Sequence, residues 1–268
     1  MTMKALCLAF AGLLAVSTAA FADDLSEPLP PQHESWSWDG IFGTYDRGQL
    51  QRGFQVYKEV CSACHSLNRV SFHDLSYENG GTGMFNDAEV KAIAAAYKIP
   101  AEPNDKGETT DANGNPLTRP GIPADHFPPP FANEQAARSA NGGALPPDQS
   151  LIVKARDGGA DYIYSVVTGD GQKPPHGFAV LQGKYYDPYF PGRNISMPPP
   201  LTANQVTYAD GTKATVDQEA KDIVAFLSWA SEPKLEDRHR IGLGVMLFMI
   251  LLSGLLYLSY RTLWKDAH

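Results

Sequence analysis

The chain has 268 residues and a formal net charge of −8, which is enough for one large domain or two small ones. An acidic balance argues against nucleic acid as a partner, because phosphates attract lysine and arginine, and it is compatible with a basic protein that docks by charge. The 21 prolines and 24 glycines favour a loop-rich domain over a bundle of long helices.

The first 22 residues have the pattern of a secretory signal peptide. Lys4 supplies the positive charge, residues 5–17 form an apolar run too short to span a bilayer comfortably, and Ala20-Phe21-Ala22 is a small-residue cleavage site. We expect cleavage after Ala22, with an uncleaved anchor as the alternative. Cys7 lies in this segment, so the mature chain would keep two cysteines.

Helical periodicity is clearest in two segments. Residues 47–60 repeat large apolar side chains at spacings of three and four, and residues 216–230 carry an apolar face that ends before Pro233. We find no repeat and no convincing strand pattern. Shorter helical segments are expected at residues 88–97, 133–139, 151–156 and 160–168.

Residues 241–260 form a run of twenty residues without a charge, roughly 30 Å long as a helix, which matches the hydrocarbon core of a membrane. No polar face breaks the run, so a buried core helix is the weaker reading. Arginines flank both ends, and the signal peptide therefore sets the orientation. Residues 23–232 would form a periplasmic domain of a single-pass protein of the bacterial inner membrane, 233–240 a linker and 261–268 a cytoplasmic tail.

Cys61-Ser62-Ala63-Cys64-His65 matches the C-x-x-C-H motif of covalent haem attachment. Two thiols at this spacing form thioethers with the two haem vinyl groups, and the adjacent histidine becomes the proximal iron ligand. A thioredoxin-like pair would need a βαβ context, and a zinc site would need further ligands at paired spacings. A plain disulfide leaves His65 unexplained.

The second axial ligand is less defined by the pattern. Met197 is the best candidate, because the prolines in Ser196-Met197-Pro198-Pro199-Pro200 fix its backbone; the alternative is a core-filling methionine. Met84 lies among glycines, on a segment that we expect to be flexible. The other candidates are His33 and three histidines that we expect to be surface residues, His73, His126 and His176.

The spacing of Gly53, Tyr57 and Cys61 before the motif resembles the N-terminal helix of class I cytochromes c, and residues 222–227 resemble the C-terminal helix that crosses it. The chain as a whole, from residue 36 onward, resembles the cytochrome c1 family, the haem subunits of cytochrome bc1 complexes. The segments that carry this resemblance are residues 52–57, Arg119-Pro120-Gly121, 141–148, 188–192, 197–200 and 229–234.

The resemblance implies an all-α, class I cytochrome c-like haem domain with long loop insertions and one C-terminal transmembrane helix. It implies a single covalent haem c with His65 and Met197 as iron ligands. Arg156 and Tyr162 would bind a haem propionate, and Pro147 would pack near the proximal histidine.

The implied role is the electron-transfer subunit of ubiquinol–cytochrome c reductase, with no bond-making catalysis by this chain alone. Its partners would be cytochrome b, the Rieske iron–sulfur protein that supplies the electron, and a soluble cytochrome c that removes it, in a dimeric complex. The acidic side chains that would attract a basic carrier, or would simply be solvated, are Glu102, Asp105, Glu108 and Asp111.

Two other functions stay open on the residues alone. A free-standing membrane-anchored cytochrome would shuttle electrons on a flexible tether, although the nine residues from Glu232 to Arg240 are few for wide excursions. A haem sensor or peroxidase would need an open or labile axial position.

Overall fold

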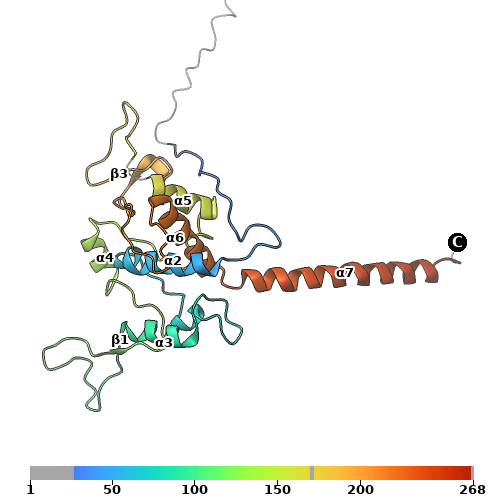
Figure 1. Cartoon of the computed structure of the whole chain (residues 1–268), viewed down its shortest axis with the longest axis horizontal. Helices are drawn as coiled ribbons and strands as arrows, with labels where there is room; N and C mark the ends of the chain where they lie inside the picture. Colours follow the sequence, from blue (N-terminus) through green and yellow to red (C-terminus); the bar gives the residue numbers. More distant parts are fainter. Residues whose placement is uncertain (1–26, 170–171, 267–268) are drawn as a thin grey trace, which may run out of the picture.

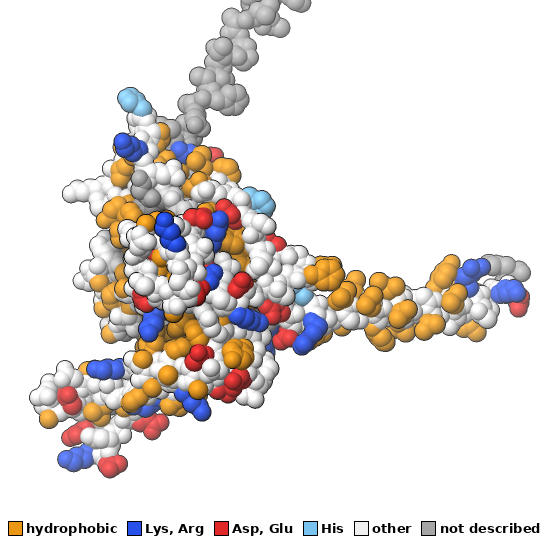
Figure 2. Space-filling view, viewed as in Figure 1, with side chains coloured by type: hydrophobic (Ala, Val, Ile, Leu, Met, Phe, Trp, Pro, Cys, Tyr) orange, Lys and Arg blue, Asp and Glu red, His pale blue; other side chains and the backbone are white. Residues whose placement is uncertain are grey.

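The computed structural model describes residues 27–169 and 172–266, so the expected signal peptide at 1–22 lies outside the described residues. A folded head is followed by one long helix, α7 (Leu235–Leu263), which extends away from it (Figure 1). The side chains along α7 are mostly hydrophobic and exposed (Figure 2). The head is mainly helical, which confirms the expected all-α class.

Two helices far apart in sequence form the centre of the head. They are α2 (Arg47–Glu59) and α6 (Val216–Ser231), and they pack directly against each other. Gly53 lies at the crossing, where an added Cβ would be 2.0 Å from the carbonyl oxygen of Asp222 and 2.7 Å from the Cβ of Phe226. The close approach of the two backbones therefore requires glycine at this position.

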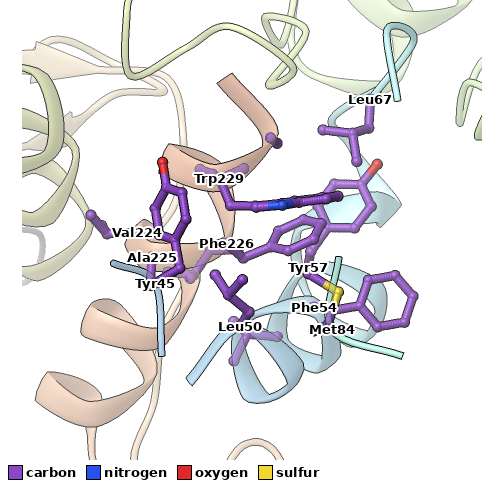
Figure 3. Packing of buried hydrophobic residues seen from close by; sticks show 14 of the residues in the cluster. Tyr45, Leu50, Phe54, Tyr57, Leu67, Met84, Val224, Ala225, Phe226 and Trp229 are labelled. Atoms are coloured by element: carbon purple, nitrogen blue, oxygen red, sulfur yellow. The ribbon is translucent and has the colours of Figure 1, made fainter. Parts of the chain in front are cut away.

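Aromatic side chains from both helices fill the space beside the crossing (Figure 3). The ring of Phe226 lies 5.7 Å from those of Phe54, Tyr57 and Trp229, measured between centroids. Such distances are typical of favourable aromatic pairs. The indole of Trp229 also donates a 2.9 Å hydrogen bond to the carbonyl oxygen of Thr82, which ties a loop to this core.

Shorter elements surround this pair. α5 (Gly159–Gly169) packs on α6, and α3 (Asp87–Ala95) packs on the 3-10 turn η2 (Phe72–Leu75). Two small antiparallel pairings join β1 to β2 and β3 to β4. The remaining elements are η1 (Cys61–Ala63), β1 (Lys98–Pro100), β2 (Thr118–Pro120), α4 (Glu134–Ala140), β3 (Tyr185–Tyr186), η3 (Pro191–Arg193) and β4 (Asn194–Ile195).

Five of the expected helices, now α2, α3, α4, α5 and α6, begin and end within one or two residues of their predicted bounds, whereas α7 begins six residues before the expected membrane span. The prediction of a helix at 151–156 is wrong, because this segment makes only a series of turns. Its one helical hydrogen bond, from the amide of Ala155 to the carbonyl of Leu151, is not continued. Gly158 and Gly159 follow with φ of +83° and +52°, a left-handed conformation that ends a helical turn.

The segment expected to be a linker is mostly helical, since α7 begins at Leu235. Its first turn is fastened to the head. The carboxylate of Glu236 accepts a 2.8 Å hydrogen bond from the amide of Tyr45 and forms a 2.8 Å ion pair with Arg47. Just before the helix, Glu232 pairs with Lys154 at 2.9 Å. The long helix is thus attached to the head by several contacts.

Candidate functional site

The C-x-x-C-H motif lies in a tight turn at the end of α2. The chain leaves α2 at Glu59 and enters η1. There the amides of Cys64 and His65 both donate to the carbonyl oxygen of Cys61, at 3.1 and 2.9 Å. Both thiols are free, so one turn presents two unpaired sulfurs and an imidazole together.

His65 is held in a defined tautomer by a residue 82 positions away. Its Nδ1 lies 2.9 Å from the carbonyl oxygen of Pro147, which can only accept, so Nδ1 carries the proton and Nε2 keeps a lone pair. Burial lowers the pKa of His65, although this hydrogen bond opposes the shift. A neutral imidazole with a basic Nε2 is the form that ligates iron. The expected placement of Pro147 near the histidine agrees with this contact.

Asp148 joins the segment that carries Pro147 to the residues after His65 by hydrogen bonds, which we call the Asp148 clasp. This carboxylate accepts 2.8 Å hydrogen bonds from the amide of Asn68 and the hydroxyl of Ser66, and a 2.9 Å bond from the amide of Ser150. Burial alone would raise the pKa of Asp148, but these donors outweigh it and the pKa is lowered.

Asp148 is a positioning residue that was not predicted from the sequence. The local signal was an aspartate two residues before a serine, a pattern typical of an Asx turn. The pattern does not indicate that the other carboxylate oxygen binds a segment some 80 residues away.

The state of the thiols distinguishes the competing uses of the motif. Burial raises the pKa of the Cys61 thiol to about 12, whereas redox-active pairs have lowered thiol pKa values. Among the described residues, no group of three or more His, Cys, Asp or Glu side chains is arranged to hold a metal ion, so the zinc reading gains no support. Two free thiols beside a neutral, oriented imidazole fit a covalently attached haem.

The two candidate methionines have different environments. Met84 is 1% exposed and belongs to the buried hydrophobic cluster drawn in Figure 3, so it is a core residue and not part of a flexible segment. Met197 is partly buried and follows β4 in the chain. Ile195 before it and Leu201 after it are both buried. No described contact joins Met197 to His65, and its ligation stays a prediction.

The four candidate histidines are all exposed, and three of them were expected to be. Three of them, His73, His126 and His176, lie on the surface of the described chain. His33 makes a 2.8 Å contact with Asp161, and its side chain is 90% exposed. None of these positions favours an axial ligand over Met197.

Comparison with known proteins decides the family. The model of the cytochrome C1 family matches residues 36–267. The chain belongs to the cytochrome c1 family. Cytochrome c1 of Rhodospirillum rubrum is 46% identical over 95% of this chain and 94% of that protein. The mitochondrial cytochrome c1 heme protein of Saccharomyces cerevisiae is 48% identical over 84% of this chain and 68% of its own length. A protein named cytochrome b/c1, from Bradyrhizobium diazoefficiens, is 44% identical, and this chain spans 40% of its length.

Membership of the cytochrome c1 family implies a haem-bearing, electron-transfer subunit of a bc1 complex. Within the described residues, α7 is the one helix long and apolar enough to cross a membrane. Both features agree with the resemblance found in the sequence.

Two further residues expected from the cytochrome c1 resemblance lie close together. Arg156 is exposed and donates a 3.0 Å hydrogen bond to the carbonyl of Ala155, and no described carboxylate forms an ion pair with it. Burial raises the pKa of the half-buried Tyr162, and the charge of Arg156 partly opposes that shift. A guanidinium and a phenol in one region suit a carboxylate partner, so their role toward a propionate remains a consistent prediction.

Proposed function

We propose that this chain is the one-electron carrier of a bc1 complex, which accepts electrons from the Rieske iron–sulfur protein and reduces a soluble cytochrome c. The observation that carries the proposal is the hydrogen bond from His65 Nδ1 to Pro147, within a C-x-x-C-H turn whose thiols are both free. This arrangement prepares Nε2 as a ligand and leaves both sulfurs available.

One haem c would be held by thioethers from Cys61 and Cys64, and it would supply one-electron exchange between Fe(III) and Fe(II). Pro147 fixes the plane and tautomer of the His65 ligand, so the imidazole does not have to reorganise during transfer. Met197 would supply a thioether as a second protein ligand, and such a soft ligand raises the reduction potential. If both His65 and Met197 held the iron, no position would stay open for a substrate, and the site would transfer electrons without making bonds; a sensor or a peroxidase would need such an open position.

The membrane arrangement follows from α7 and the signal peptide pattern. Residues 241–260 would span the inner membrane once, with the head at 23–232 on the periplasmic side and 261–268 as a cytoplasmic tail. Tyr257, Tyr260 and Trp264 would lie at the inner interface, where aromatic residues are enriched. The name of the cytochrome b/c1 relative supports an association with cytochrome b, and the complex would be dimeric.

The attachment of α7 to the head argues against a free-standing shuttle. A shuttle needs a flexible tether, whereas helix α7 includes most of the expected linker. Glu232 pairs with both Lys154 and Arg238, and Glu236 pairs with Arg47. Exposed ion pairs are individually weak, but together with the buried Leu235 they give the junction one arrangement. A head held in this way would need mobile partners to reach it.

The acidic loop remains a candidate docking patch for the soluble carrier. Two of its four carboxylates support the loop itself: Glu108 accepts from the amide of Asn104's side chain at 2.8 Å, and Asp111 accepts from the amides of Asn113 and Asn115. Neutralising all four should flatten the salt dependence of cytochrome c reduction if the patch steers docking. An unchanged salt slope would discard the patch.

Purification in mild detergent on an affinity tag tests the complex. We expect cytochrome b and the Rieske protein to co-purify with this chain, and quinol to reduce its haem. A matched preparation carrying a tag on cytochrome b should recover the same three subunits. Recovery of this chain alone, with a haem that quinol cannot reduce, would favour the free-standing cytochrome.

A further inference from the structure

A short turn in the N-terminal arm exposes two large apolar side chains beside the start of α7. Ile41 and Phe42 are 69% and 76% exposed, at the tip of residues 39–43. The arm, the dark blue segment of Figure 1, loops out toward the first turns of α7. Figure 2 shows hydrophobic side chains at the point where α7 leaves the head.

The turn has a fixed shape. Its base is buried, since Trp36 and Trp38 stack with ring centroids 5.0 Å apart and are each less than 10% exposed. The amide of Thr44 donates to the carbonyl of Ser37 at 3.0 Å, closing the turn. At Gly43 an added Cβ would lie 2.2 Å from the backbone of Trp38, so the closure requires glycine. The apolar tip is thus presented outward by a packed base.

The turn is also placed at a definite level along α7. Three residues after Phe42, the amide of Tyr45 binds Glu236 in the first turn of that helix. Three residues of extended chain reach about 11 Å at most. The charge-free run begins at Ile241, five residues beyond Glu236, or about 7.5 Å along the helix axis. The tip can therefore reach the level at which the apolar span begins.

The surroundings favour a lipid surface as the occupant. Residues 235–247 of α7 contain no aromatic residue, whereas the other end of the span has three. Arg238 and Arg240 lie in the same turns and pair with Glu232 and Asp237, but their side chains are 59% and 79% exposed. The N–H groups that these pairs leave free can bind headgroup phosphates. The nearest acidic group of the turn, Asp39, is directed back into it, because it accepts a 3.1 Å hydrogen bond from the amide of Trp36.

We infer that Ile41 and Phe42 insert into the head-side interface of the bilayer and form a second membrane contact beside α7. The inference rests on the proposed membrane span. Two contacts, one helix and one turn, fix the tilt of the head as well as its distance from the bilayer, which a single helix does not do.

Photocrosslinking in native membranes tests this contact. Phe42→p-benzoylphenylalanine in the full-length holo chain should give phospholipid adducts on irradiation, detected by mass spectrometry. The matched control is the same replacement at Leu181, an apolar position 59% exposed on a loop distant in sequence from α7; it should give no lipid adduct. The positive control is Leu256, 61% exposed within α7.

Four results are distinguishable. Lipid adducts at positions 42 and 256 but not 181 support the inference. Adducts of position 42 with another polypeptide would overturn the inference and show a protein contact at the turn. The absence of any adduct at position 42 would also overturn it and show that the turn is exposed to water. Loss of lipid adducts at position 256 would instead refute the membrane span.

Discussion

The helix crossing at Gly53 gives the sharpest test of the packing. In Gly53→Ala the new Cβ would lie 2.0 Å from the carbonyl oxygen of Asp222, a distance that real contacts do not show, so α2 and α6 must separate by about 1 Å or more. The obstacle is backbone, which cannot rotate away. Overpacking of this kind costs about 3 kcal/mol, and the better helix propensity of alanine returns about 1 kcal/mol. We expect a net loss of about 2 kcal/mol or more.

Gly48→Ala in the same helix is the matched control. There the new Cβ would meet only side-chain atoms, Asp46 Oδ1 at 3.3 Å and Arg52 Nη1 at 3.7 Å, so a small shift of the Asp46 side chain makes room for it. We expect a change between zero and about 1 kcal/mol, in the stabilising direction. Guanidinium unfolding of the holo chain in detergent, followed by circular dichroism, measures both. A wild-type midpoint for Gly53→Ala would refute the crossing, and equal losses in both variants would point to α2 as a whole.

Three further predictions concern the site and the core. Met197→Leu should lower the reduction potential by an amount on the order of 100 mV or more, whereas Met84→Leu in the core should leave it unchanged. If a redox titration shows the shift for Met84→Leu instead, Met84 and not Met197 is the iron ligand. Asp148→Ala should destabilise the head by about 2 kcal/mol, because it removes three hydrogen bonds to a charged group, and unchanged unfolding would show that the clasp is dispensable. Burial raises the pKa of Glu219 above its usual 4.5. The protonated side chain therefore contributes to stability fully below pH 4.5, and this contribution is lost as the pH rises through the pKa of the folded state. Glu219→Gln should lack this loss, and parallel stability–pH curves for the two proteins would contradict the reasoning.

Local patterns were sufficient for the motif, the main helices and the apolar span, because each is encoded within a few residues. The contacts that orient these parts join residues far apart in sequence. The bond from His65 to Pro147 crosses 82 positions, and the bond from Tyr45 to Glu236 crosses 191. No periodicity or spacing encodes such pairs. The family resemblance anticipated Pro147, but not the aspartate beside it.

Glycine was the residue most easily misread. The glycines before Met84 predicted flexibility, yet an added Cβ at Gly83 would lie 2.0 Å from the backbone of Leu75. Glycine there permits close packing, and Met84 is consequently buried. Gly158 and Gly159, by contrast, have a left-handed backbone and follow the turns that stand where a helix was predicted at residues 151–156. A sequence alone does not separate these uses, because each depends on what lies across the fold.

Two groups of long-range contacts should affect different properties of the protein. The contacts of Asp148 and Pro147 near His65 should affect the reduction potential, and the contacts of Glu236 at the start of α7 should affect how the head is positioned for its partners. The Asp148 clasp and Pro147 act on the His65 imidazole, so their variants should change the potential of the site while leaving the head in place. The Glu236 junction acts on the head as a body, so Glu236→Gln should leave the potential unchanged and slow electron delivery from the partner that must reach a fixed position. A potential shift in Glu236→Gln would mean that the junction and the site are mechanically coupled through α2, whose first residue, Arg47, pairs with that carboxylate and whose far end leads into the motif.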